Sequence, residues 1–146
     1  MEKRIGVLLI EDDPFQREII REYLEAVTRY KILEAQGQCH ILACCENPLY
    51  KVGIVLVDMD WPRAGRVDLV LEIRRRNPTL PILGMTDHSV HPSKDPRLWM
   101  SFIEFIPKPF APHHLNRSVQ AVLNAREVSG IGMKPKRKKA IQENGV

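Results

Sequence analysis

Hydrophobic and polar positions follow two different patterns along most of the chain. Short, nearly continuous apolar runs recur, as in parallel strands that are buried on both faces. They predict strands over Ile5–Ile10, Lys31–Ala35, Val52–Val57, Pro81–Met85 and Phe105–Ile106. Between these runs apolar residues recur every three or four positions, which is typical of amphipathic helices. This spacing predicts helices over residues 14–27, 39–46, 67–76 and 114–128, with a short one over 98–102.

The predicted helices differ in how clearly the sequence marks them. The first has Pro14 in its first turn and apolar residues that recur every three or four positions, namely Phe15, Ile19, Ile20, Tyr23, Leu24 and Val27. The stretch from 87 to 96 is far less regular, because Pro92 and Pro96 both oppose a helix. His88 and His91 fall in this stretch and are interpreted as loop residues, and His113 and His114 as residues at a helix start.

Strands that alternate with helices predict an α/β fold with a doubly wound, five-stranded parallel sheet and helices on both faces. In such sheets the ligand site lies beyond the carboxyl ends of the strands. We therefore expect the polar residues that follow the strands to converge there. These are Asp12, Asp13, Asp58, Thr86 and Lys108.

These residue types together favour phosphoryl chemistry. Carboxylates brought close to one another repel unless a cation joins them, and oxygen ligands of this kind suit Mg²⁺. Phosphoryl transfer needs an in-line nucleophile, a divalent ion and polar partners for the phosphoryl oxygens. Asp58 has the chemistry of such a nucleophile, and Lys108 and Thr86 have that of the partners.

Four stretches resemble the receiver domain of two-component response regulators, over roughly residues 4–126. In order they are Val7–Pro14, Val55–Asp58 with Pro62 four residues on, Pro81–Thr86 and Ile106–Phe110. Each motif is weak by itself, but their order and spacing match the family. The resemblance implies the flavodoxin-like (βα)5 receiver fold.

The same resemblance implies a role for four acidic residues. Asp58 would be the phosphoacceptor and a ligand of Mg²⁺. Asp12 and Asp13 match the acidic pair that holds the ion, and Asp60 lies where the family uses a main-chain carbonyl as a further ligand. Asp12 and Asp13 have an alternative role as caps of the following helix.

It also implies a switch. Thr86 and Lys108 match the hydroxyl and the lysine that sense the phosphoryl group, and Phe105 matches the switch aromatic, with packing in the core as its alternative. The family pattern further predicts a cis peptide bond between Lys108 and Pro109.

The chain departs from the family pattern at several positions. The glycine expected eight residues after the phosphoacceptor is replaced by Arg66, with Gly65 one position earlier. Asp87 follows Thr86 where the family prefers a small residue, and we expect its carboxylate to narrow access to the phosphoryl group and to repel it. Ser101 and Phe102 replace the usual small pair before the last strand.

Three functions remain open on this evidence. The favoured one is a single-domain response regulator that accepts a phosphoryl group from a histidine kinase or phosphotransfer protein and signals by protein contact. It is no enzyme beyond self-phosphorylation and slow self-dephosphorylation. A pseudo-receiver, an interaction module not switched by phosphate, is the second hypothesis. A haloacid-dehalogenase-like phosphatase, suggested by the Asp-x-Asp of Asp58 and Asp60, is the third and weakest.

Composition and charge add limits. The chain is 44% hydrophobic and 27% charged, as in soluble globular proteins, and no apolar run is long enough to span a bilayer, so we expect a cytoplasmic protein. Cys39, Cys44 and Cys45 argue against a disulfide framework and are interpreted as packing residues. A zinc site with His40 and Cys44 lacks further ligands nearby.

Most of the net charge of +4 lies in residues 127–146. We therefore expect a receiver domain over 1–126 and a basic, disordered tail over 127–146. Such a tail is too short to be a DNA-binding output domain. The run Lys134–Lys139 has the charge for weak contact with nucleic acid or an anionic membrane, and the protein is expected to be a monomer or a weak homodimer.

Overall fold

The computed structural model describes residues 4–60, 65–87, 97 and 104–129. Its five strands form one parallel sheet in the order β2-β1-β3-β4-β5. The strands are β1 (Gly6–Ile10), β2 (Lys31–Glu34), β3 (Val52–Asp58), β4 (Ile82–Thr86) and β5 (Glu104–Pro107). The predicted fold class is confirmed, and each strand lies within one or two residues of its expected bounds.

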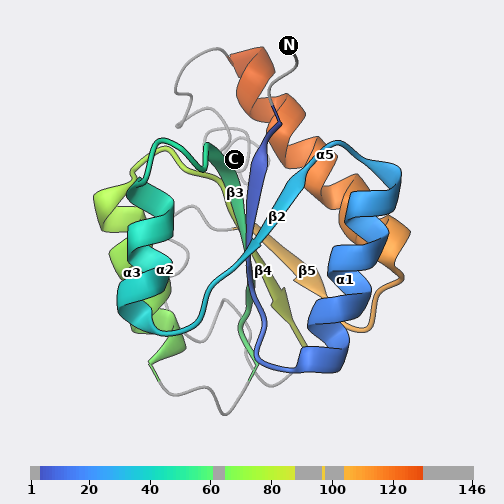
Figure 1. The fold of residues 1–146 in the computed structure, drawn as a ribbon, viewed down its shortest axis with the longest axis horizontal. Coiled ribbons are helices and arrows are strands. Elements are labelled where there is room, and N and C mark those ends of the chain that lie inside the picture. The colour runs from blue at the N-terminus through green and yellow to red at the C-terminus, as the bar shows by residue number, and fades with distance from the viewer. Residues whose placement is uncertain (1–3, 61–64, 88–96, 98–103, 130–146) are drawn as a thin grey trace, which may run out of the picture.

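Helices cover both faces of the sheet. They are α1 (Pro14–Val27), α2 (Gln38–Glu46), α3 (Arg66–Arg76) and α5 (Pro112–Ser129). In Figure 1, α1 and α5 lie on one side of the sheet, and α2 and α3 lie on the other. Helix α5 begins before the expected residue 114 and continues past the domain boundary expected at 126. The irregular segment 88–96 and the expected helix over 98–102 fall outside the described residues.

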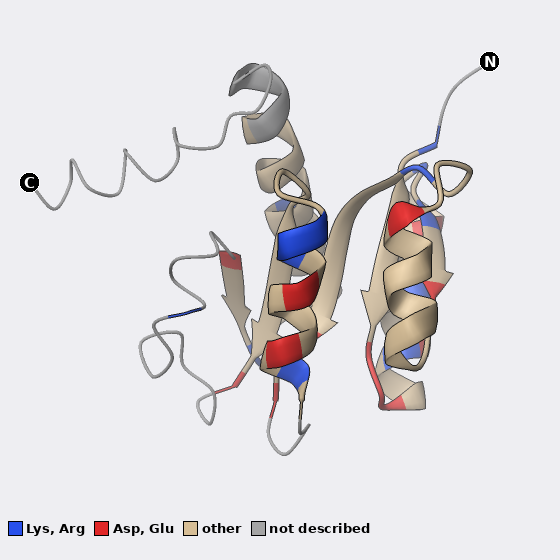
Figure 2. Ribbon diagram, turned by 90° about the vertical axis from the view of Figure 1, so that its left-hand side faces the viewer, with Lys and Arg blue, Asp and Glu red and all other residues tan. Residues whose placement is uncertain are grey.

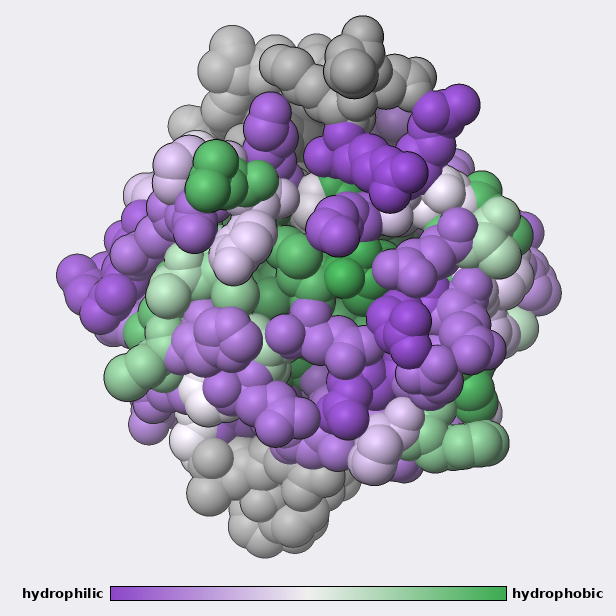
Figure 3. Space-filling view, in the orientation of Figure 1, coloured by the Kyte–Doolittle hydropathy of each residue, from purple (hydrophilic) through white to green (hydrophobic). Residues whose placement is uncertain are grey.

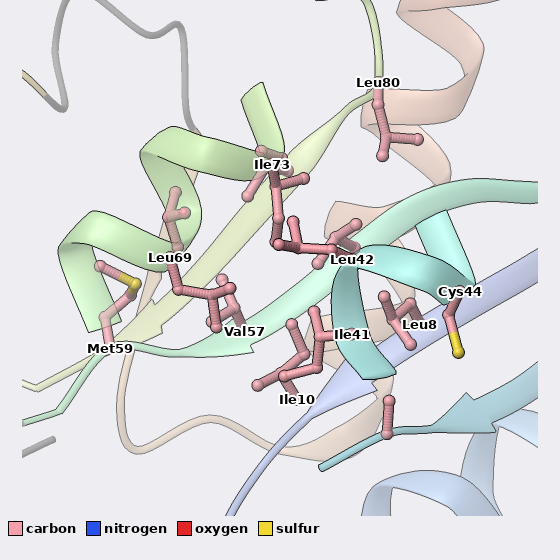
Figure 4. Packing of buried hydrophobic residues seen from close by; sticks show 14 residues of the cluster. Leu8, Ile10, Ile41, Leu42, Cys44, Val57, Met59, Leu69, Ile73 and Leu80 are labelled. Carbon is pink, nitrogen blue, oxygen red and sulfur yellow. The ribbon is translucent and has the colours of Figure 1, made fainter. Parts of the chain in front are cut away.

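The continuous apolar runs of the central strands have a simple cause. Successive residues of a strand point to opposite faces of the sheet, and here each face is covered by helices. Leu8 and its neighbours pack with α2 and α3 in one cluster, shown in Figure 4. Leu9 and its neighbours pack with α1 and α5 in a second cluster. The residues that point to either face of each central strand are therefore apolar.

The apolar stripe of α1 is buried only in its middle. Ile20 and Leu24 are buried, whereas Phe15 is 71% exposed and Val27 is also exposed. The spacing correctly predicts the helix, but its two end residues do not face the core. The core contacts of α1 are thus made by its middle turns, through Ile20 and Leu24.

The three cysteines differ in how far they are buried. Cys44 is buried in the cluster of α2 and α3, as a packing residue should be. Cys39 is exposed, so its interpretation as a packing residue is wrong. It lies in the first turn of α2, and the buried positions of that helix are Ile41, Leu42 and Cys44.

The surface is mainly polar on the face drawn in Figure 3. Apolar residues show near the middle of that view, where β2 passes in Figure 1, and charged and polar residues surround them. Within the described parts of the chain, no helix combines the length and the apolar character that crossing a membrane requires.

Candidate functional site

The carboxyl end of β3 places one acidic side chain at the centre of the sheet. Asp58 is the last residue of β3 and only 4% exposed. β3 lies between β1 and β4, so residues that follow those strands come close to it. One Asp58 oxygen, Oδ1, accepts a hydrogen bond from the amide of Asp60 at 3.0 Å. Figure 2 shows acidic segments at this lower end of the sheet.

Lys108 comes to this centre from β5. Its amide donates to the carbonyl of Thr86 at 2.8 Å, which fixes the turn after the strand. Its Nζ donates to Asp58 Oδ1 at 3.0 Å and to Asp60 Oδ2 at 2.7 Å. Burial alone would lower the pKa of Lys108. The hydrogen bonds to Asp60 and Asp58 have the larger combined effect and raise that pKa. The Lys108–Pro109 peptide bond is cis, as expected.

The carboxylate of Asp60 takes part in the site through hydrogen bonds, and the sequence analysis did not predict this. Oδ2 accepts from Lys108, and Oδ1 accepts from the amide of Asp87 at 2.8 Å. The carboxylate thus ties the loop after β3 to the residue that follows β4. The resemblance to receiver domains had assigned a role only to the main-chain carbonyl of Asp60.

Glu11 is a further member of the site that sequence reasoning missed. It directly follows β1 and is only 5% exposed. Burial raises the pKa of its carboxyl to about 7, and the negative charge of the neighbouring Asp58, to which it is hydrogen-bonded, adds to the effect. The signal was its place as the first residue past the apolar run.

The predicted acidic pair, Asp12 and Asp13, is divided between two tasks. Asp12 Oδ2 accepts from Arg66 at 2.8 Å. Asp13 is the N-cap of α1, and its Oδ1 accepts from the amide of Phe15 at 3.0 Å. The structure therefore gives the Asp13 carboxylate the capping role that the sequence had left as an alternative. Of the three consecutive acids, Glu11 lies beside Asp58 and Asp12 pairs with Arg66.

Arg66 is the second cation at this end of the sheet. It is the first residue of α3, and its side chain is 11% exposed. One guanidinium nitrogen donates to the carbonyl of Asp58 at 2.9 Å and another to the Asp12 carboxylate. The sequence had marked this position only as a departure from the usual glycine.

The two predicted switch residues lie on neighbouring strands. Thr86 is buried at the end of β4, and its hydroxyl donates to the carbonyl of Asp87 at 3.0 Å. Phe105 on β5 pairs in register with Gly84 and is partly buried. Its ring covers that glycine so closely that a Cβ there would come within 2.9 Å of a ring carbon.

The site has oxygen ligands of the kind that a divalent ion binds, but its carboxylates already pair with basic side chains of the same chain. Carboxylate and carbonyl oxygens are the ligands that Mg²⁺ prefers. Yet no three acidic, histidine or cysteine side chains of the described segments converge so as to hold a metal ion. Arg66 binds Asp12, and Lys108 binds Asp58 and Asp60.

Curated proteins similar to the chain are transcriptional regulators. The C4-dicarboxylate transport transcriptional regulatory protein DctD of Pseudomonas aeruginosa is 28% identical over 84% of this chain and 26% of its own length. The transcriptional regulatory protein RprY of Bacteroides fragilis is 27% identical over 89% of this chain and 53% of its own. The chain thus spans between a quarter and about half of these relatives.

Solved structures of receiver domains share the fold. A CheY-like response regulator receiver domain protein from Methanospirillum hungatei superposes with a TM-score of 0.75 at 19% identity, over 88% of this chain and all of its own. The receiver domain of a sensor histidine kinase from Pseudomonas aeruginosa gives 0.68 at 20% identity, over 84% and 99% of the two chains. That structure holds a magnesium ion in its active-site cleft.

The family model of the response regulator receiver domain matches residues 7–120, well over half of the chain. This range covers the sheet except its first residue, helices α1, α2 and α3, the first half of α5 and every side chain of the site. The chain therefore belongs to the response regulator receiver domain family.

Proposed function

We propose that the chain is a phosphorylation switch in which Asp58 accepts a phosphoryl group. The observation that carries this proposal is the contact between Asp58 and Lys108, at 3.0 Å, at the carboxyl end of the central strand. A buried carboxylate beside a lysine offers a nucleophile together with a cation for the phosphoryl oxygens. Thr86, buried at the end of the neighbouring strand, supplies a hydroxyl for the same purpose.

The reaction follows from these groups. An Asp58 carboxylate oxygen attacks the phosphorus of a phosphohistidine, and the bond between phosphorus and the imidazole nitrogen breaks, with its electron pair remaining on nitrogen. The product is an acyl phosphate on Asp58. Lys108 then loses one carboxylate partner and gains phosphoryl oxygens, so its contact with Asp60 is free to change. Movement of Thr86 and Phe105 in response would carry the signal.

Mg²⁺ belongs to this proposal, with Glu11, Asp12, Asp58 and the carbonyl of Asp60 as the residues that would hold it. The ion would neutralise charge on the transferring phosphoryl group. Glu11 enters this set in place of Asp13, whose carboxylate caps α1. Because Glu11 is buried beside Asp58, a divalent cation would also relieve their mutual repulsion.

The partners follow from the same proposal. A histidine kinase or phosphotransfer protein would donate the phosphoryl group in the cytoplasm, and a downstream protein would read the switched surface. That the chain acts as a single domain is also a proposal, since its curated relatives are longer than the chain. The basic run Lys134–Lys139 lies outside the described residues, and its weak electrostatic role stays a prediction.

The test is phosphorylation by a small donor. The protein is incubated with Mg²⁺ and acetyl phosphate, and its intact mass is measured beside the variants Asp58→Asn and Asp68→Asn. Asp68 is an exposed aspartate of α3, so its variant controls for the loss of one carboxylate. We expect the wild type and Asp68→Asn to gain one phosphoryl group, and Asp58→Asn to gain none.

A second candidate is the pseudo-receiver, and one observation favours it. Arg66 and Lys108 already bind the acids that would meet a metal ion and a phosphoryl group. In that case the wild type would gain no mass under any Mg²⁺ concentration. Membership of the receiver family argues against the phosphatase hypothesis, and turnover of a generic phosphomonoester would be needed to revive it.

A further inference from the structure

Arg66 joins two chain segments at the carboxyl end of the sheet. Its guanidinium donates to the main-chain carbonyl of Asp58, at 2.9 Å, and to Asp12 Oδ2, at 2.8 Å. Asp58 is the last residue of β3, and Asp12 lies just after β1. With its side chain only 11% exposed, Arg66 is held in this place and is more than a surface charge.

The helix that carries Arg66 does not explain its position. A cation at a helix N-terminus faces the positive end of the helix dipole, which is unfavourable. The other arginines of α3 follow the opposite rule, since they lie in its last turn, where the dipole favours them. The contacts that stabilise the charge of Arg66 are therefore the tertiary ones, to Asp12 and to the end of β3.

The ion pairs at this end of the sheet form two groups. Lys108 forms ion pairs with Asp58 and Asp60, and Arg66 forms one with Asp12. A divalent ion bound here would draw on carboxylate and carbonyl oxygens, and the Asp12 carboxylate is one that Arg66 already uses. A guanidinium is planar, always charged and weakly hydrated, so it forms such a pair at low cost.

We propose that Arg66 is a built-in counter-ion of this site, which Mg²⁺ must displace from Asp12 in order to bind. The inference rests on the proposed function in one respect, namely that the ion binds at this end of the sheet. It adds that the chain itself supplies a cation to the Asp12 carboxylate, with which the ion competes. The affinity for Mg²⁺ is therefore lower than the acidic residues alone would give.

Calorimetric titration of Mg²⁺ tests this inference without any phosphorylation. Arg66→Met keeps an unbranched side chain of similar length but removes the charge and the hydrogen bonds. Its dissociation constant for Mg²⁺ should be at least about tenfold lower than that of the wild type, because the ion no longer competes with a cation for Asp12. Arg66→Lys, which keeps the charge, should stay closer to the wild type.

The matched control is Arg75→Met, which removes one exposed charge from the same helix. Its affinity for Mg²⁺ should equal that of the wild type. A thermal melt with and without Mg²⁺ gives a second readout, in which the ion should raise the melting temperature of Arg66→Met more than that of the wild type. This readout also establishes that the variant is folded.

Two results would overturn the inference. One is an equal Mg²⁺ affinity in the wild type and Arg66→Met, which would make Arg66 a structural link only. The other is no binding by either protein, because the loss of Arg66 should open the site. The mass measurement on the wild type is separate, so failure of the proposed function appears there as the absence of a phosphoryl group.

Discussion

Asp13 is the one of the three consecutive acids after β1 whose carboxylate serves a helix. Its backbone has the extended conformation of an N-cap, and its side chain accepts from the amide of Phe15. This bond satisfies one of the amide groups that the first turn of α1 leaves without a helical partner. The neighbouring Glu11 and Asp12 are thereby left as the acids that face the site.

We predict that Asp13→Ala lowers the free energy of unfolding by about 1 kcal/mol, the usual cost of a lost N-cap. Asp13→Asn should cost little, because asparagine caps equally well. Urea denaturation measures both changes. Phosphorylation by acetyl phosphate should be unaffected in Asp13→Asn, and its loss there would return Asp13 to the site, as the sequence had indicated.

The sequence predicted most of the site residues but not how they are paired. Asp58, Thr86 and Lys108 were identified because each comes at or just after the end of a predicted strand, and the structure places all three at one end of the sheet. Glu11 was missed because three consecutive acids contain two adjacent pairs, and the resemblance was assigned to the second pair although Glu11 directly follows the apolar run. The contacts of Arg66 depend on a loop path that periodicity does not describe.

At the level of elements, two glycines on neighbouring strands show how closely β1 and β3 are fitted. A Cβ on Gly6 would come within 2.3 Å of the main-chain carbonyl oxygen of Tyr50. A Cβ on Gly53 would instead meet a methyl group of Ile5, at 2.8 Å. Backbone cannot move aside as a side chain can, so the two positions differ in tolerance.

We therefore predict that Gly6→Ala lowers the free energy of unfolding by about 2 kcal/mol or more, at the upper part of the range for overpacking. Gly53→Ala should cost less, because the exposed Ile5 is able to change its rotamer. Thermal or urea denaturation compares the two variants. Equal losses would show that the start of β1 adjusts more easily than its contact with Tyr50 indicates.

The order and type of the elements followed from the sequence, whereas their ends and neighbours did not. Apolar runs and helical spacing were sufficient for five strands and four described helices. The strand order was not predicted and came from the structure, because periodicity does not specify which strands pair. The exposure of Phe15 and Val27 was not predicted, because periodicity indicates a helix without showing how much of its apolar stripe is covered.

At the scale of the whole molecule, the sheet separates two apolar clusters. Ile73 of α3 belongs to one, and Ile20 of α1 belongs to the other. Both are almost completely buried. Since the two side chains share no cluster, they should not affect each other directly, although both stabilise the same sheet.

We predict that Ile73→Val and Ile20→Val each lower the free energy of unfolding by about 0.5 to 1.5 kcal/mol. In the double variant the losses should add to within about 0.5 kcal/mol, in a single transition with an unchanged dependence on urea. Two separate transitions would contradict this prediction and show that the layers on either side of the sheet unfold independently.

The separation of Lys108 from its partners along the chain has a consequence for synthesis. Lys108 comes 50 residues after Asp58, an interval that a ribosome crosses in roughly 2.5 to 10 s. Until then the emerging chain holds Glu11, Asp58 and Asp60 without their lysine, and β5 is not yet available to the sheet. A nascent chain halted in this interval would hold the nucleophile without the cation that serves it, so only a finished domain has both.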